Sequence, residues 1–330
     1  MQQTARLVPG RIRAEAGRGT AAWRLWLCLL AAFVLCPLFF RAQAAETRVM
    51  EGPDIRVLYS EPFLEPSARE VMARYPFLKE SLESIFLWDM DFSPQVLLVG
   101  DHGTFVMMAG HEDFVAYALP QKRLVVIDST RMGARPFTLE MTLKHELCHL
   151  LLNHHVTEVH LPRWLEEGIC QWVSEGIPEV VLDRRASALP YAAISGTLMP
   201  LEALSGSFPR DSRGLALAYE QSRSVVEYII DSYGTHGVLN ILESMKNGIP
   251  ARDAIRMALL VTPEELEAEW QSDLRSLPVL LALLAGNLYT LLFVLAAVLT
   301  VLGYLRFLRR RKRYRLEQEE PEEQGDSAQP

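Results

Sequence analysis

One short segment constrains this chain of 330 residues more than any other: His145-Glu146-Leu147-Cys148-His149. Apolar residues at helical spacing before it, and Leu150-Leu151-Leu152 after it, predict that the segment lies within one α-helix. Residues four positions apart lie on one face of a helix, so His145 and His149 can both reach one metal ion. Glu146 lies beside them, where its carboxylate could accept a proton from a metal-bound water.

A second segment could supply a third ligand. The sequence Leu161-Pro162-Arg163-Trp164-Leu165-Glu166-Glu167-Gly168 is typical of the start of a helix, with Pro162 near its first turn. A catalytic zinc site has three protein ligands and one open position for water. A carboxylate on this helix could therefore complete a site begun by the two histidines.

The two segments together resemble the gluzincin metallopeptidases, which include aminopeptidase N and the smaller bacterial peptidase MA-like domains. The glutamate before the glycine is the third ligand in that family, and here it is Glu167. The 17 residues between His149 and Glu167 are close to the family's usual spacing. The resemblance covers roughly residues 50 to 275 and implies Zn²⁺ held by His145, His149 and Glu167, with Glu146 as the general base.

A third block, Tyr219-Glu220-Gln221-Ser222, also resembles these peptidases. Their tyrosine hydroxyl stabilises the oxyanion, which implies a catalytic role for Tyr219. The alternative is a core tyrosine, because Leu215, Ser222, Val226 and Ile229 follow the same helical face.

Two other residues compete with Glu167 as the third ligand. His155 stands where a metzincin places its third histidine, but that arrangement needs a glycine for its sharp turn, and Leu152 occupies the position here. Glu166 is adjacent to Glu167 but points about 100° away around the helix. His102, His111, His154, His160 and His236 have no partner motif and are expected at the surface.

The two ends of the chain predict a membrane protein. Residues 1–44 carry several arginines, an apolar run and an Ala-Gln-Ala site, as in a cleaved signal peptide, with an N-terminal anchor as the alternative. Residues 278–305 contain no charged residue and are long enough to span a bilayer. The tail, 306–330, begins with a basic cluster that marks the cytoplasmic side and ends acidic. Residues 45–277 are therefore expected to lie outside the cytoplasm, on the periplasmic or extracytoplasmic side of the cell membrane.

The composition of the chain excludes few classes of protein. The net charge of −8 gives no reason to expect nucleic acid as a partner. Cys148 and Cys170 are the two cysteines of the exported part, and they are expected to be buried thiols or, in an oxidising compartment, a disulfide. About 230 residues suffice for one domain with a sizeable core.

The pattern of elements predicts an α+β fold. Strands are expected at 55–59, 95–99 and 123–127. Helices are expected at 67–87, 104–108, the motif segment, 162–175, 215–232, 236–247 and 263–276. This order gives a small N-terminal sheet with helices, followed by a helical half. It agrees with the gluzincin architecture, whose zinc cleft lies between the two parts and whose substrate often pairs with the strand before the motif helix, here near Leu124 to Asp128.

The function expected from these features is a membrane-anchored zinc metallopeptidase that acts on a peptide or protein substrate. The alternative is an envelope assembly or binding protein that keeps the gluzincin scaffold without catalysis. An intact Glu146 argues against the alternative, because a structural metal site needs no general base. No segment resembles the exopeptidase motif of the aminopeptidase N relatives, so an aminopeptidase is not implied.

Overall fold

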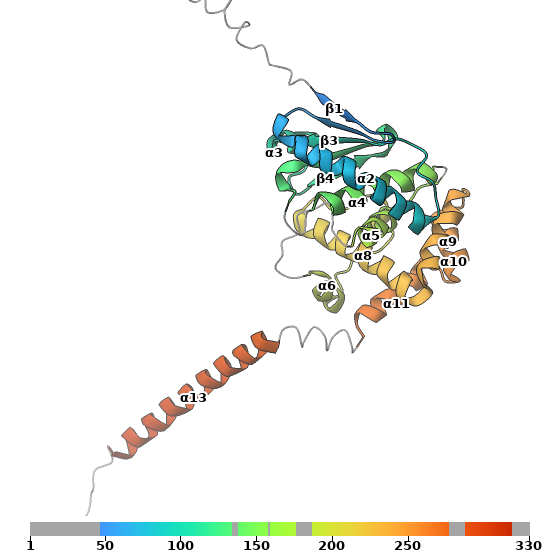
Figure 1. The fold of residues 1–330 in the computed structure, drawn as a ribbon. Helices are drawn as coiled ribbons and strands as arrows, with labels where there is room; N and C mark the ends of the chain where they lie inside the picture. Colours follow the sequence, from blue (N-terminus) through green and yellow to red (C-terminus); the bar gives the residue numbers. More distant parts are fainter. Residues whose placement is uncertain (1–46, 134–137, 158, 176–186, 277–287, 319–330) are drawn as a thin grey trace, which may run out of the picture. The chain divides into compact units, whose positions relative to one another are not determined.

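The computed structural model describes residues 47–133, 138–157, 159–175, 187–276 and 288–318 (Figure 1). The expected signal segment, residues 278–287 of the expected span and the last part of the acidic tail lie outside these residues. The described elements form a mixed α+β structure with a five-stranded sheet toward the N-terminal side, as predicted.

The sheet has the strand order β1-β2-β3-β5-β4. Its strands are β1 (Arg48–Glu51), β2 (Arg56–Tyr59), β3 (Gln95–Val99), β4 (Ala116–Leu119) and β5 (Leu124–Asp128). β2, β3 and β5 are parallel neighbours, and β4 pairs antiparallel with β5. The three predicted strands are confirmed to within a residue at each end, whereas β1 and β4 were not predicted.

The position of β5 corrects one expectation. β5 was expected to pair with substrate, but both of its sides are already hydrogen-bonded, to β3 and to β4. β1 and β4 are the two edge strands of the sheet, and β4, the edge strand next to β5, has an outer side that an extended peptide could pair with.

Helices cover both faces of the sheet (Figure 1). α2 (Glu65–Phe86) and α4 (Leu139–His155) share the main core with one set of alternating strand residues, which includes Val96, Leu98 and Ile127. α3 (His102–Ala109) buries Phe105 against the opposite set, which includes Val99 and Val126. This alternation follows from the two-residue period of a strand, and it makes α4 a helix buried beneath the sheet.

The rest of the described domain is helical. Its helices are α5 (Arg163–Val173), α6 (Leu189–Ser195), α7 (Ala203–Gly206), α8 (Ser212–Tyr233), α9 (Thr235–Lys246), α10 (Ala251–Leu259) and α11 (Pro263–Leu274). α11 begins with the capping box of Thr262 and Glu265. Three short 3-10 turns, η1 (Pro62–Leu64), η2 (Pro120–Lys122) and η3 (Ser129–Arg131), belong to the sheet half. α6, α7 and α10 were not predicted; the other helices were.

α5 and α8 pack closely because α5 has a glycine at their contact. A Cβ built on Gly168 would collide with the carbonyl oxygen of Ser222 and would lie 2.6 Å from Cγ2 of Val226. Any side chain larger than hydrogen would therefore push α8 away from α5. The glycine of the Glu-Gly pair is explained by this packing, which also brings Tyr219 on α8 to the side of Glu167.

The last described helix, α13, extends from Leu288 to Gln318. Its part from Leu288 to Lys312 is long and apolar enough to cross a membrane, and the most apolar stretch of this part is not buried against the rest of the protein. This agrees with a C-terminal membrane span.

Candidate metal centre and active site

Three buried side chains converge between α4 and α5. His145 and His149 come from one face of α4, and Glu167 comes from the second turn of α5. One potential ligand atom from each lies within 4.8 Å of the other two. Glu167, rather than Glu166 or His155, thus lies beside the two histidines.

The spacing of the three atoms suits zinc. The His145 and His149 Nε2 atoms are 3.2 Å apart. Oε2 of Glu167 lies 3.8 Å from the His145 Nε2 and 3.5 Å from the His149 Nε2. A tetrahedral zinc ion with bonds of about 2.0–2.1 Å holds its ligand atoms roughly 3.3–3.4 Å apart. The observed triangle brackets that value, and its two-nitrogen, one-oxygen donor set leaves a fourth position for water.

Each histidine is held by its other ring nitrogen. The Nδ1 of His149 donates to Oε1 of Glu166 at 2.8 Å, and the same oxygen accepts from the Asn153 amide at 2.6 Å. The Nδ1 of His145 lies 3.3 Å from the Ser174 hydroxyl, which itself donates to the Cys170 carbonyl. The hydroxyl oxygen can therefore accept from Nδ1. Both arrangements leave Nε2 as the metal-facing lone pair, and such outer partners fix ring orientation at metal sites.

The comparison with known families adds an independent observation. Residues 125–276 match the family model of the Peptidase MA superfamily, and they include all three residues of the triangle. The resemblance to gluzincin peptidases is thereby confirmed for this part of the chain. No curated protein matches the chain.

Glu167 is ionised although it is buried. Burial raises the pKa of this carboxyl, but the two histidine rings outweigh burial and leave the pKa lowered, so Glu167 is a carboxylate. Burial lowers the pKa of His149, but the adjacent Cys170, Glu167 and Glu166 outweigh it, and the pKa is raised well above its usual range. A protonated His149 would have to lose the proton on Nε2 before that atom could bind a metal ion.

The second oxygen of Glu167 has its own partners. The Tyr219 hydroxyl donates to Oε1 at 3.3 Å, and the Arg163 Nε lies 3.5 Å from the same atom. The Tyr219 ring stands edge-on to Phe208, and the Arg163 guanidinium lies over Phe208, 4.6 Å from its centre. These contacts turn Oε2 of Glu167 toward the histidines.

Tyr219 thus contacts a predicted ligand, yet it is fully buried and does not line the cavity beside the metal site. Arg163 does line that cavity. The sequence offered a signal for Arg163, because an arginine four residues before a glutamate on a helix faces it. Arg163 was not predicted as a site residue, and Glu166 is the partner of His149 rather than a rival ligand.

Glu146, the expected general base, is fully buried on α4 between the two turns that carry the histidines. Its place in the chain puts it next to His145, and the burial keeps its carboxylate away from bulk water.

The other candidates lie elsewhere. His155 hydrogen-bonds the Asp89 carbonyl at 2.9 Å and packs against Trp88, so it does not join the triangle. Cys148 and Cys170 are buried and free, and burial followed by contact with Cys148 raises the pKa of the Cys170 thiol. The expectation of two buried thiols is confirmed.

A cavity of about 360 Å³ opens beside the triangle. His149 and Glu167 form part of its lining, and Tyr117 and Ala118 of β4 form another part. The cavity thus lies between the sheet and α5, as the predicted cleft does. The matched family segment begins at residue 125, so β4 is a part of the site that the family match does not include.

Proposed function

We propose that this protein is a zinc-dependent metallopeptidase that hydrolyses peptide bonds. The observation that carries the proposal is the triangle of His145, His149 and Glu167, with the carboxylate of Glu146 on the same helix, in a peptidase MA domain. Zinc bound there would polarise the substrate carbonyl and lower the pKa of its water.

The side chains of the chain would then do three tasks. Glu146 accepts the proton of the attacking water and passes it to the leaving amine. Glu166 and Ser174 hold the histidine rings in the metal-facing orientation. Tyr219 or Arg163 donates to the negative charge that develops on the carbonyl oxygen. Tyr219 is the residue implied by the family resemblance, and Arg163 is favoured by its place in the cavity lining.

The substrate we propose is an extended polypeptide. The outer side of β4 is not paired with another strand of the described sheet, and two β4 residues line the cavity beside the triangle. A peptide that adds to this edge as a further strand would bring a carbonyl group to the metal site through backbone hydrogen bonds. The recognition is then mostly independent of side chains near the scissile bond.

The anchoring we propose is a single C-terminal span with the catalytic domain outside the cytoplasm. The cluster Arg306, Arg309, Arg310 and Arg311 lies at the C-terminal side of the apolar part of α13, and such clusters remain in the cytoplasm. A reporter fused after Gly325 should be cytoplasmic, whereas one inserted near Gly52 should be external. The reverse pattern would contradict this topology.

The decisive experiment separates metal binding from catalysis. The full-length protein in detergent should contain about one zinc, and Glu167→Ala should remove most of it, whereas His155→Ala should not. Glu146→Gln should keep the zinc and the fold but lose at least about 10²–10⁴-fold in peptidase activity, the usual contribution of a general base.

The outcomes distinguish the two functions. A wild-type protein that binds zinc but cleaves no peptide of a diverse library, together with a Glu146→Gln variant that is unimpaired in the organism, would favour the non-catalytic envelope protein instead.

A further inference from the structure

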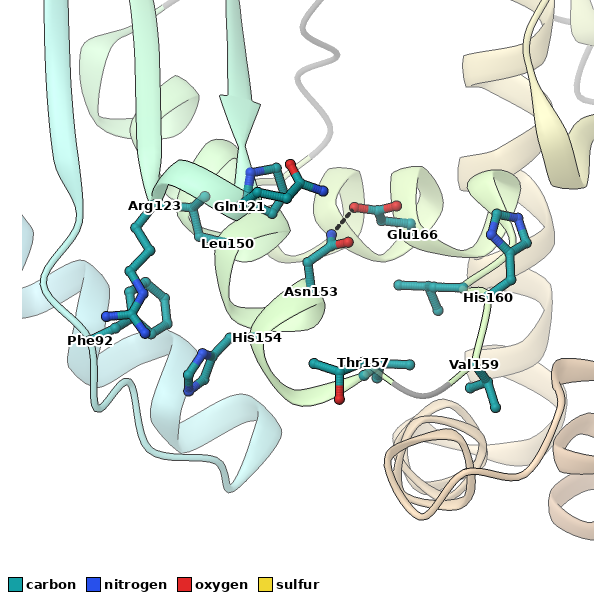
Figure 2. Close-up of a pocket in the computed structure, with 13 residues that line it drawn as sticks. Phe92, Gln121, Arg123, Leu150, Asn153, His154, Thr157, Val159, His160 and Glu166 are labelled. Carbon is teal, nitrogen blue, oxygen red and sulfur yellow. Dashed lines mark hydrogen bonds between the residues drawn. The ribbon is translucent and has the colours of Figure 1, made fainter.

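A second cavity adjoins the one at the metal site. It has a volume of about 500 Å³ and lies beyond Asn153 and Glu166, toward the end of α4 (Figure 2). Both cavities are lined by Pro120, Gln121, Asn153, His160, Leu161 and Glu166. An extended substrate that occupies the first cavity can therefore reach the second.

The boundary between the two cavities is the pair of Asn153 and Glu166. Their hydrogen bond of 2.6 Å is drawn at the centre of Figure 2, and Glu166 also holds His149. A group in the second cavity thus lies next to the outer partners of a metal ligand without touching the ligand triangle itself.

The acidic groups around the second cavity have hydrogen-bond or ion-pair partners, whereas one basic group differs. Glu166 accepts from His149 and Asn153, and nearby Asp91 pairs with His154 at 2.6 Å. The guanidinium of Arg123 has no carboxylate within ion-pair distance among the residues that the structure describes, and it lies over the Phe92 ring, 5.5 Å from its centre. Arg123 is therefore a cation on the cavity wall that can take a ligand (Figure 2).

The backbone of Arg123 is held firmly. Its N–H donates to the Pro120 carbonyl at 3.0 Å, and its carbonyl accepts from the Gln95 N–H at 2.8 Å. A guanidinium that stacks on an aromatic ring keeps its N–H edges available, and those edges match the two oxygens of a carboxylate. Buried apolar side chains of Leu150 and Leu161 line the same cavity and suit the aliphatic part of such a ligand.

We propose that Arg123 makes the second cavity a subsite for a carboxylate of the peptide substrate. The proposal rests on the proposed peptidase function, because it takes the substrate to be a peptide on the edge of β4. The carboxylate is either an acidic side chain or the C-terminal carboxylate, and the direction of the peptide decides between them.

The course of the chain after β4 shows which end of the peptide each direction would bring to Arg123. β4 ends at Leu119, and the chain continues through Pro120 and Gln121 into the lining of the second cavity. A peptide antiparallel to β4 would lead its residues N-terminal to the scissile bond toward Arg123, and the subsite would take an acidic side chain. A parallel peptide would lead its C-terminus there.

The test uses binding, so that it does not depend on turnover. Zinc-loaded, full-length Glu146→Gln protein in detergent is titrated with three fluorescent peptides of equal length. The first has an internal glutamate and an amidated C-terminus. The second has glutamine in place of the glutamate and is also amidated. The third has the glutamine and a free C-terminus.

Either the first or the third peptide should bind with a Kd at least about tenfold lower than that of the second. This is the effect expected from one added charge-assisted hydrogen bond between a carboxylate and Arg123. A preference for the first identifies an acidic side chain, and a preference for the third identifies the terminal carboxylate. Replacement Arg123→Gln should abolish the preference, and Arg123→Glu should transfer it to a peptide with lysine in place of the glutamate. Lys122→Gln, a change at the neighbouring exposed residue outside both cavity linings, should leave it intact.

Equal binding of the three peptides, or a preference that survives in both Arg123 variants, would overturn the inference. Cleavage by the wild-type protein is measured separately. If the protein prefers the carboxylate peptide but cleaves no peptide, the proposed peptidase function is rejected and the proposed subsite is supported. If it cleaves peptides but shows no preference for a carboxylate, the peptidase function is supported and the subsite is rejected.

Discussion

Gly168→Ala tests whether the close approach of α5 and α8 supports the metal site. The new Cβ would collide with the Ser222 carbonyl oxygen and lie 2.8 Å from the carbonyl carbon of Ser222. Carbon atoms in contact are about 3.5–4.0 Å apart, so α8 must withdraw by roughly 0.7 Å or more. The obstructing atoms belong to a helix backbone, which cannot rotate away as a side chain can.

The expected loss of stability comes from two opposing effects. Overpacking costs about 1–3 kcal/mol, and the rigid backbone contact places this change near the upper end. Alanine regains about 1 kcal/mol of helix propensity over glycine. The net loss of about 2 kcal/mol corresponds to a decrease in Tm of about 4–8 °C for a domain of this size.

The assay is thermal unfolding of the full-length protein in detergent, together with a zinc competition titration. Ser222 lies one turn after Tyr219, so the movement of α8 should also lengthen the Tyr219–Glu167 hydrogen bond and weaken zinc binding. Gly103→Ala is the matched control, because its Cβ would meet only an ordinary 3.4 Å contact in α3, and its Tm should be unchanged or slightly higher. A Gly168→Ala protein as stable as wild type would refute the packing argument, and a lower Tm with unchanged zinc affinity would refute the link to the metal site.

Three further predictions concern the same site. Glu166→Ala removes the partner of His149 and should weaken zinc binding about 10–100-fold, as measured by competition with a chelator; unchanged affinity would show that the 2.8 Å contact does not orient the ring. Tyr219→Phe should lower kcat and kcat/KM together by about 10²–10³-fold if the hydroxyl stabilises the oxyanion, whereas a loss of zinc affinity at preserved kcat would assign it to the positioning of Glu167. Because the pKa of His149 is raised, a proton competes with zinc at neutral pH, so zinc affinity should increase from pH 6 to pH 8 by up to about tenfold per pH unit for each displaced proton; a flat profile would contradict this.

The parts of the site that the sequence predicts are those with a short-range pattern. His145 and His149 are four residues apart on a strongly apolar segment, so their common face follows from helix geometry. Glu167 follows from the second helix and the family spacing. The geometry of the triangle agrees with both.

The parts that the sequence does not predict depend on tertiary contacts. β4 has only four residues, Ala-Tyr-Ala-Leu, with two alanines and no β-branched residue, so its propensity is weak and its pairing with β5 determines it. The role of Glu166 depends on where His149 points. That no carboxylate of the described residues pairs with Arg123 depends on which side chains the fold brings near it. Neither feature can be predicted from the spacing of residues along the chain.

The ligand triangle and Arg123 differ in their position relative to the matched family segment. The ligand triangle lies inside the matched segment, residues 125–276, whereas Arg123 and the β4 residues of the lining precede it. An inhibitor that only chelates the metal would rely on the features this domain shares with its relatives. A compound that also carries an acidic group into the second cavity would rely on Arg123, which lies outside the matched segment, and its selectivity should therefore come from the part that reaches Arg123.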